Sequence, residues 1–338
     1  SKRIVLVGNS EAPVVPHVIE GYRMMGALAE DEELKILDNS KFCDNRRACR
    51  PFSSNAGFTC AEASMWLVLM DDELALSSGA RILGSVPDVF VHADGYKKSI
   101  PGPGIGNYIT VAKAMASAKA LLGEDILQNG SFMQAHGTGT PQNRVTESHI
   151  LNEMAKNFGI DSWLTGAVKC YLGHSMAPAG GDQLSAILGI WEDGWFPGIK
   201  TIDHVAEDVH DSNLTLPFSD VELDPSEVPL GFINSKGFGG NNATGFFVSP
   251  TKTKTLLEKR WGRKILTTHH RLTETVEQAA QEYNQKADDS DSKPIYQFGE
   301  GVVEGEDLDI STKEIVIPGF NQSINLELES PYGDLQEQ

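Results

Sequence analysis

The chain has 338 residues, 40% of them hydrophobic, and a formal net charge of −19. Its apolar content is enough for one large core or two modest ones, and it lacks the run of roughly eighteen apolar residues that a membrane span needs. The negative charge argues against binding to nucleic acid or to an anionic membrane. The 4 cysteines and 9 histidines show no zinc-type spacing. The sequence therefore predicts no metal site, no cofactor, reduced thiols and a cytoplasmic location.

Hydrophobic periodicity predicts alternating strands and helices along the first 250 residues. In chain order we expect a strand at 3–7, a helix at 17–29, strands at 64–70 and 79–92, a helix at 107–122, a strand at 131–135, a helix at 145–157, a strand at 163–168, a helix at 179–193, and strands at 213–218, 229–234 and 245–249. The strand at 3–7 is expected to be buried and the one at 64–70 to be central, whereas 30–60 is polar and predicts irregular structure. This alternation is typical of a layered α/β fold.

The composition shifts after residue 250. The last part holds one expected amphipathic helix, at 271–286, an acidic linker and short strand-like runs. This composition predicts that residues 251–338 form an extension that wraps the main body, and not a second enzymatic domain.

Three loops carry residues that could do chemistry, and each begins where a predicted strand ends. They are His136-Gly-Thr-Gly-Thr140, the stretch from Lys169 to His174, and the stretch from Asn234 to Asn242. Functional groups of α/β sheets lie at such strand ends. Singly, each has a structural explanation as a hydrogen-bonded loop or a turn, and HGTGT lacks the third glycine of a dinucleotide fingerprint. Glu147, on the following helix, could be a solvated charge or a helix-terminal one.

Together, in this order and at these separations, the loops resemble the HGTGT, KxxxGH and GFGGxN motifs of β-ketoacyl-ACP synthases in the thiolase superfamily. Residues 10–28 and 50–64 add weaker similarity, so the resemblance covers residues 1 to about 250. It implies a thiolase-like layered αβαβα fold. The end of the N-terminal thiolase half would occupy 1–78, the C-terminal half 79–250, and an extension 251–338. The extension resembles the long proteobacterial synthases that start fatty acid synthesis from acetyl-CoA (the FabY type).

What the resemblance implies is a decarboxylative Claisen condensation. An acyl group rests on a cysteine, malonyl-ACP loses carbon dioxide, and the resulting enolate attacks the acyl thioester. His136 and His174 would donate imidazole N–H bonds to the enolate oxygen, supported by Lys169 and Glu147. The other implied site residues are Phe238, Gly239 and Gly240 for the oxyanion hole and gate, and Thr138 and Thr140 for the pantetheine arm.

The family's nucleophile lies upstream of the segment where the resemblance begins. None of Cys43, Cys49, Cys60 and Cys170 is assigned to that role, so the chain is expected to be the part of a synthase without the nucleophile. Three further positions depart from the family: Arg144 and Gln183 replace acidic residues, and Lys236 replaces an aromatic one. These changes alter the charge around the site and put the starter preference in doubt.

The resemblance also implies partners: acyl carrier protein, malonyl and acyl thioesters that include acetyl-CoA, and a second copy in a homodimer. The candidate docking residues are Arg46, Arg47 and Arg50, or Lys97 and Lys98, which could equally be ordinary solvated charges. Two other functions stay open. Ser175, in Gly-His-Ser-Met-Ala, resembles the nucleophile elbow of α/β-hydrolases and acyltransferases. Alternatively, the chain is a non-catalytic, synthase-like partner subunit.

Overall fold

The computed structural model describes residues 3–95, 104–291, 298–330 and 333–335. These fall into two units, Ser1–Glu277 and Gln278–Gln338, each of which is described by itself. The boundaries expected at residues 78 and 250 stay predictions.

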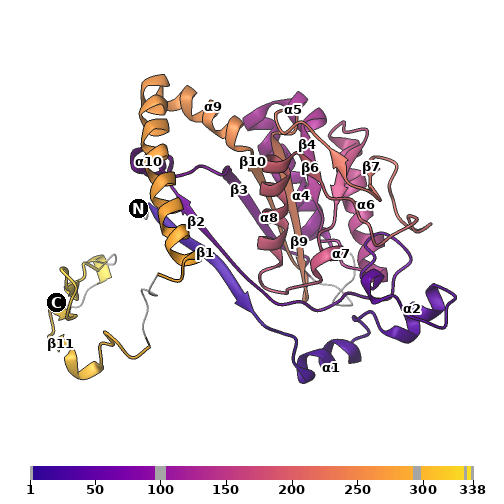
Figure 1. The fold of residues 1–338 in the computed structure, drawn as a ribbon, viewed down its shortest axis with the longest axis horizontal. Coiled ribbons are helices and arrows are strands. Elements are labelled where there is room, and N and C mark those ends of the chain that lie inside the picture. The colour runs from indigo at the N-terminus through magenta and orange to yellow at the C-terminus, as the bar shows by residue number, and fades with distance from the viewer. Residues whose placement is uncertain (1–2, 96–103, 292–297, 331–332, 336–338) are drawn as a thin grey trace. The chain divides into compact units, whose positions relative to one another are not determined.

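A six-stranded mixed sheet is the centre of the first unit (Figure 1). Its strands are, in spatial order, β3 Ser85–Ala93, β10 Asn241–Val248, β9 Leu230–Gly237, β4 Ser131–Gln134, β5 Trp163–Gly166 and β7 Leu214–Thr215. The last four run parallel to one another, whereas β10 is antiparallel to both of its neighbours. Because β4, β5 and β9 are parallel, the loops that follow them emerge at the same edge of the sheet.

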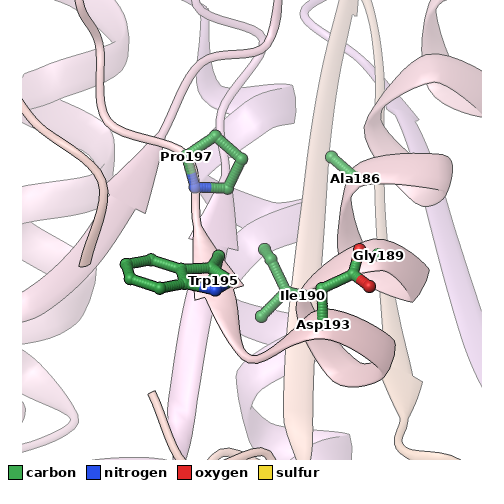
Figure 2. Close-up of a pocket in the computed structure, with 6 residues that line it drawn as sticks. All are labelled: Ala186, Gly189, Ile190, Asp193, Trp195 and Pro197. Atoms are coloured by element: carbon green, nitrogen blue, oxygen red, sulfur yellow. The ribbon is translucent and has the colours of Figure 1, made fainter. Parts of the chain in front are cut away.

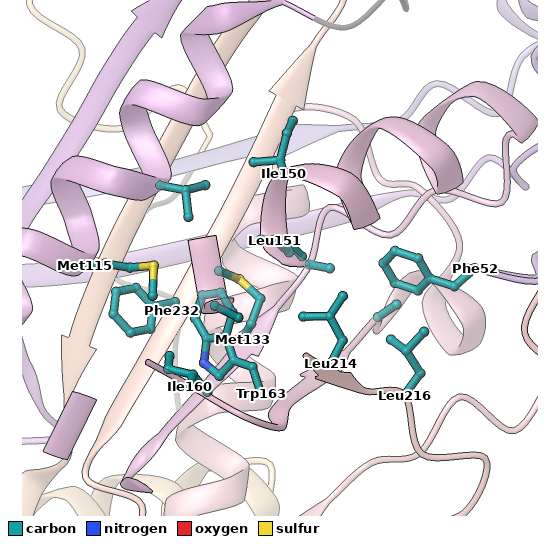
Figure 3. Close-up of a cluster of buried hydrophobic side chains, with 14 of the residues drawn as sticks. Phe52, Met115, Met133, Ile150, Leu151, Ile160, Trp163, Leu214, Leu216 and Phe232 are labelled. Atoms are coloured by element: carbon teal, nitrogen blue, oxygen red, sulfur yellow. The ribbon is translucent and has the colours of Figure 1, made fainter. Parts of the chain in front are cut away.

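Helices cover both faces of this sheet. On one face lie α4 Ile105–Leu122, α5 Glu124–Asn129 and α6 Pro141–Asn157, and on the other lies α8 Ala179–Asp193. Successive residues of a strand point to opposite faces, so Met133 of β4 joins the larger core while Phe132 packs against Ile187 of α8. Figure 3 shows the larger core, where Met115, Met133 and Trp163 lie within one cluster of buried side chains. The central strands are thus buried on both faces.

A separate antiparallel ribbon consists of β1 Ile4–Glu11 and β2 Ala63–Met70. Leu67 of β2 packs against the buried cluster that α8 forms with the sheet, so the ribbon lies beside that helix. The predictions of a buried strand at 3–7 and a central strand at 64–70 are wrong in this respect. Ile4 is 53% exposed, Leu6 62% and Val68 57%. An apolar run indicates a strand but does not determine how many neighbours that strand has.

The other elements of the first unit are short or peripheral. They are α1 Pro16–Met24, α2 Asp31–Leu37, η1 Asn45–Arg47, α3 Asp72–Ser78, α7 Lys169–Leu172, β6 Trp195–Phe196, β8 Val221–Glu222, α9 Pro250–Trp261 and α10 Arg263–Asp288, which continues into the second unit. The irregular structure expected for 30–60 is wrong in part, because the acidic first turn of α2 suits a helix N-terminus. Helix α9 was not predicted, and the strand expected at 79–92 begins only at Ser85.

The second unit contains the end of α10 and a small antiparallel sheet. The remaining elements are η2 Gly305–Asp307, β11 Asp309–Ile310, β12 Glu314–Val316, β13 Ile324–Asn325 and η3 Gly333–Leu335. Among the helices that the structure describes, none is long and apolar enough to cross a membrane.

Candidate active site

The three loops predicted from the sequence meet at the edge of the sheet where β4, β5 and β9 end. His136 follows β4, and His174 follows β5 and the one-turn helix α7. Their imidazole rings have centroids 5.5 Å apart and stand almost perpendicular, at 83°. Both histidines are therefore available to one small substrate group.

Glu147 of α6 ties the first loop to the sheet. Its carboxylate is fully buried and accepts hydrogen bonds from the backbone N–H groups of His136 and Gly137, at 2.7 and 2.8 Å. It also accepts from the side-chain amides of Asn143, at 2.8 Å, and Asn234, at 2.7 Å. Four N–H donors surround one carboxylate, which satisfies its lone pairs without water. The family resemblance implied that Glu147 supports the histidine. In the structure it does so through a direct hydrogen bond from the backbone N–H of His136.

Lys169 holds the same loop from the other side. Its ammonium donates to the backbone carbonyl oxygen of His136 at 2.7 Å, and the side chain is only 2% exposed. Burial lowers the pKa of Lys169 to about 8, and the nearby Glu147 carboxylate opposes this shift. His136 is therefore fixed through both its N–H and its C=O, and its ring direction follows from a clamped backbone.

Both imidazoles are neutral at physiological pH. The Nδ1 atom of His174 accepts the backbone N–H of Met176 at 3.1 Å, so the ring proton resides on Nε2. Burial, and then the charge of Lys169, lower the pKa of His174 to about 3. Burial is also the main cause that lowers the pKa of His136, followed by Lys169, His174 and Lys236. A neutral imidazole N–H can stabilise an oxygen that gains negative charge during a reaction.

The third loop is a tight turn between two long strands. The loop expected from 234 to 242 is wrong in extent, because β9 continues to Gly237 and β10 begins at Asn241. Gly239 and Gly240 have φ of 84° and 91°, which disfavours any residue with a Cβ. Phe238, at the tip, is 48% exposed and its ring is stacked on Tyr22 of α1, with centroids 6.0 Å apart.

Aromatic rings connect this turn to the histidines. Tyr22 also contacts Phe58 edge-on at 5.4 Å, and Phe58 contacts His174 at 5.3 Å. The site is therefore bordered by apolar rings on the side of α1. Sequence reasoning missed Tyr22 and Phe58, although both lie in the two segments whose similarity to the family was weaker.

Three residues singled out in the sequence, Thr138, Thr140 and Gln183, make polar contacts that the sequence did not reveal. Thr138 and Thr140 share a hydrogen bond between their hydroxyls at 3.0 Å, and Thr138 is 5% exposed. Gln183 was interpreted as a change of charge. Its amide nitrogen donates to the carbonyl oxygens of Gln134 and Ala135, both at 2.8 Å, and to that of Asn234 at 3.0 Å. It joins the ends of β4 and β9 beneath the site.

Ser175 does not have the surroundings of a nucleophile elbow. Its hydroxyl donates to Asp182 at 2.5 Å, and the side chain is 1% exposed. The residue with positive φ, 63°, is Met176 rather than the serine. Since Nδ1 of the adjacent His174 is occupied by the Met176 N–H, this imidazole does not act on Ser175 through that atom. Arg144, the other departure, is bound to both carboxylate oxygens of Asp208 at 2.8 Å.

The thiols of the chain lack the features of a reactive cysteine. Burial raises the pKa of Cys49 to about 11, and it also raises the pKa values of Cys43, Cys60 and Cys170. A nucleophilic cysteine needs the opposite shift. In the described part of the chain, no three His, Cys, Asp or Glu side chains form a group that could hold a metal ion.

The candidate docking arginines are engaged by carboxylates of this chain. The pairs are Arg46 with Asp44, Arg47 with Asp203, and Arg50 with Asp38. Lys97 and Lys98 lie outside the described residues. Figure 2 shows a surface depression beside α8 and β6, which shares no residue with the histidine site; it is lined by Ala186, Gly189, Ile190, Asp193, Trp195 and Pro197.

Comparison with known proteins gives three findings. Residues 83–202 match the profile of the β-ketoacyl synthase C-terminal domain. The β-ketoacyl-[acyl-carrier-protein] synthase FabY of Pseudomonas aeruginosa is 49% identical over 334 residues, which cover 98% of this chain and 52% of that protein. The crystal structure of the FabY ketosynthase from P. aeruginosa superposes with a TM-score of 0.88 and 48% identity, over 99% of this chain and 52% of that one.

A more distant structure resembles part of the chain. It is a type II polyketide acyl-carrier protein in complex with its ketosynthase, at TM-score 0.60 and 22% identity, covering 73% of this chain and 56% of that one. The chain thus spans about half the length of the relatives that it matches.

Proposed function

We propose that this chain, which carries a β-ketoacyl synthase C-terminal domain on a thiolase-like α/β fold, supplies the condensing histidines of a β-ketoacyl-[acyl-carrier-protein] synthase in fatty acid biosynthesis. The observation that carries the proposal is the pair of neutral imidazoles of His136, which is buried, and His174, which is half-buried, with ring centroids 5.5 Å apart. The name of the relative with 49% identity supports the same reaction.

The reaction requires an oxygen to carry negative charge for a short time. When the malonyl thioester loses carbon dioxide, the electron pair of the broken C–C bond becomes an enolate whose charge lies on the thioester oxygen. The Nε2–H of His174 and the imidazole of His136 donate to that oxygen. The enolate carbon then attacks the acyl-cysteine carbonyl, a C–C bond forms, the C–S bond breaks, and the cysteine leaves as a thiolate that takes up a proton.

The other predicted residues support this step in different ways. Lys169 and Glu147 position His136 through its backbone. Phe238, Gly239 and Gly240 form the turn proposed as oxyanion hole and gate, and Thr138 and Thr140 offer hydroxyls to the pantetheine arm. These roles are part of the proposal.

The cysteine that carries the acyl group is proposed to be none of the four in these 338 residues. Burial raises the pKa of each thiol, which opposes thiolate formation. The match of residues 83–202 to the C-terminal domain of β-ketoacyl synthases supports this proposal.

Substrates and partners follow as parts of the same proposal. We expect malonyl-ACP as the extender, an acyl thioester such as acetyl-CoA as the starter, a homodimeric enzyme and a cytoplasmic location. The distant relative in complex with an acyl-carrier protein supports such a partner.

The test is a condensation assay on the natural full-length protein that contains these residues. Acetyl-CoA and malonyl-ACP are supplied, and the acyl group on the carrier protein is identified by mass spectrometry. We expect a β-ketobutyryl group with the native protein, and a loss of about 100-fold or more when His136 or His174 is replaced by alanine. A native protein that consumes malonyl-ACP without forming this product contradicts the proposal.

The serine-dependent alternative makes an opposite prediction for one variant. Ser175→Ala removes a buried hydroxyl that donates to Asp182, so a synthase should keep most of its rate. If all thioester chemistry is lost while the variant remains folded, the hydrolase-type acyltransferase is correct. A partner subunit without activity predicts no product from any variant.

A further inference from the structure

We propose that Lys236 is a substrate-binding residue of this site and pairs with the carboxylate of the malonyl thioester before that carboxylate leaves. The inference rests on the proposed condensing function. It gives a role to a residue that stands where the family carries an aromatic side chain.

Lys236 belongs to the same hydrogen-bond network as the histidines. It is the next-to-last residue of β9, two positions before Phe238. Its ammonium donates to the side-chain oxygen of Asn143 at 3.1 Å. The amide nitrogen of Asn143 binds Glu147, and Glu147 holds the backbone of His136. Three consecutive contacts therefore connect the Lys236 charge to a condensing histidine.

The two lysines whose charge reaches His136 differ in exposure. Both Lys169 and Lys236 lower the pKa of that imidazole. Lys169 is 2% exposed and donates to the His136 carbonyl from within the protein. Lys236 is only partly buried, and it lies next to the open turn at Phe238. A bound anion can therefore approach Lys236 more easily than Lys169.

The ammonium group of Lys236 can offset the negative charge of the malonyl carboxylate. The malonyl group brings a negative charge to a chain whose net charge is −19, and a nearby ammonium favours its binding. Decarboxylation then removes this charge from the carboxylate and places it on the oxygen near the histidines. The pairing with Lys236 is present in the bound substrate and is weakened in the transition state. Lys236 should lower the KM for malonyl-ACP without raising kcat.

Two substitutions separate the charge of Lys236 from its hydrogen bond. Lys236→Gln keeps a donor for Asn143 and removes the charge, whereas Lys236→Met removes both; Lys236→Arg keeps the charge. Lys254→Met, on the exposed side of α9, makes the same change in net charge elsewhere and is the control. Each is introduced into the full-length protein, and thermal unfolding verifies that it is folded.

Initial rates are measured at saturating acetyl-CoA while malonyl-ACP is varied. We expect the KM for malonyl-ACP to rise about fivefold in Lys236→Gln and Lys236→Met, the gain of a partly exposed ion pair. The kcat should not fall in Lys236→Gln. Lys236→Arg and the control should stay within twofold of the native KM. Acetyl-ACP, which lacks the carboxylate, should inhibit the native protein and Lys236→Gln equally.

Two other results would overturn the role of Lys236, and a third would refute the proposed function itself. An unchanged KM in Lys236→Gln overturns the inference, whatever Lys236→Met does, because the residue then acts only through its contacts within the protein. A fall in kcat at constant KM also overturns it and indicates a structural role. Failure of the native protein to form a β-ketoacyl product refutes the proposed function itself, and is seen before any variant is tested.

Discussion

Replacing Glu147 with glutamine is expected to destabilise the chain strongly, although the two side chains have the same shape. The carboxylate accepts N–H donors from His136, Gly137, Asn143 and Asn234 at 2.7 to 2.8 Å. A glutamine has one acceptor oxygen, and its NH2 group would face two of these donors. Two hydrogen bonds to a charged group are then lost, and each is worth about 1.5–3 kcal/mol.

The free energy of unfolding should therefore fall by about 3–6 kcal/mol, a large part of the stability of a typical domain. Urea denaturation followed by tryptophan fluorescence measures this change. Glu153→Gln, in the same helix α6, is the matched control and should change stability by less than about 1 kcal/mol. A Glu147→Gln variant that unfolds at the same urea concentration as the control refutes the idea that this carboxylate holds the loop of His136.

Three further predictions concern charge and pH. Burial lowers the pKa of Lys169 to about 8 from 10.5, so the unfolded chain binds more protons between these values and stability should rise with pH there; the rise should disappear in Lys169→Met. The pKa of His174 is lowered to about 3 from 6.5, so its contribution to stability should decrease as the pH falls from 6.5 towards 3, and NMR should show no titration of its ring between pH 5 and 8. Arg50 is 4% exposed and binds both oxygens of Asp38 at 2.7 Å. Arg50→Met should lower the free energy of unfolding by about 1–3 kcal/mol because it removes both hydrogen bonds that the partly exposed Asp38 carboxylate accepts from Arg50; an equal midpoint of urea unfolding would contradict this.

The alternation of strands and helices predicted a layered α/β fold, and the family resemblance implied that it is thiolase-like; both predictions are confirmed. The expected helix at 179–193 is α8 residue for residue, and the expected helix at 107–122 differs from α4 by two residues at its start. These segments have apolar positions at helical spacing and a glycine at their C-terminal end, at Gly194 and Gly123. In both segments the spacing of the apolar residues and the terminal glycine indicate the same helix. The sequence alone is therefore sufficient to predict these two helices.

Exposure and strand extent were harder to predict. The apolar residues of β1 and β2 indicate strands, but the exposure of Leu6 and Val68 depends on which segments lie beside them. The glycine-rich stretch after residue 234 indicated a loop. The cross-strand pairs of β9 and β10 extend the strands into it as far as Gly237 and Asn241. Pairing between strands is a tertiary property and overrides the local preference of glycine.

The site residues were assigned from the resemblance of three motifs, in their order along the chain, to those of a known family. Their interactions could not be predicted in this way. The sequence around Glu147 does not indicate that its carboxylate accepts hydrogen bonds from two backbone N–H groups of the HGTGT loop. From the sequence, Gln183 was only a neutral residue in place of an acidic one. The structure shows that its amide nitrogen donates to three backbone carbonyl oxygens. Asn143 could have been found, because it lies four residues before Glu147 on one helix face. The catalytic assignments of His136, His174 and Lys169 stay predictions until they are tested.

The central claim is that two neutral imidazoles stabilise an enolate, and decarboxylation alone tests it most directly. Malonyl-ACP labelled with 13C in its carboxylate is given to the full-length protein after its thiols are blocked with iodoacetamide, so that no acyl-cysteine can form. We expect labelled carbon dioxide to be released still, and His136→Gln and His174→Gln, in folded protein, each to slow the release by about 100-fold. Release at the native rate from either variant would contradict the account.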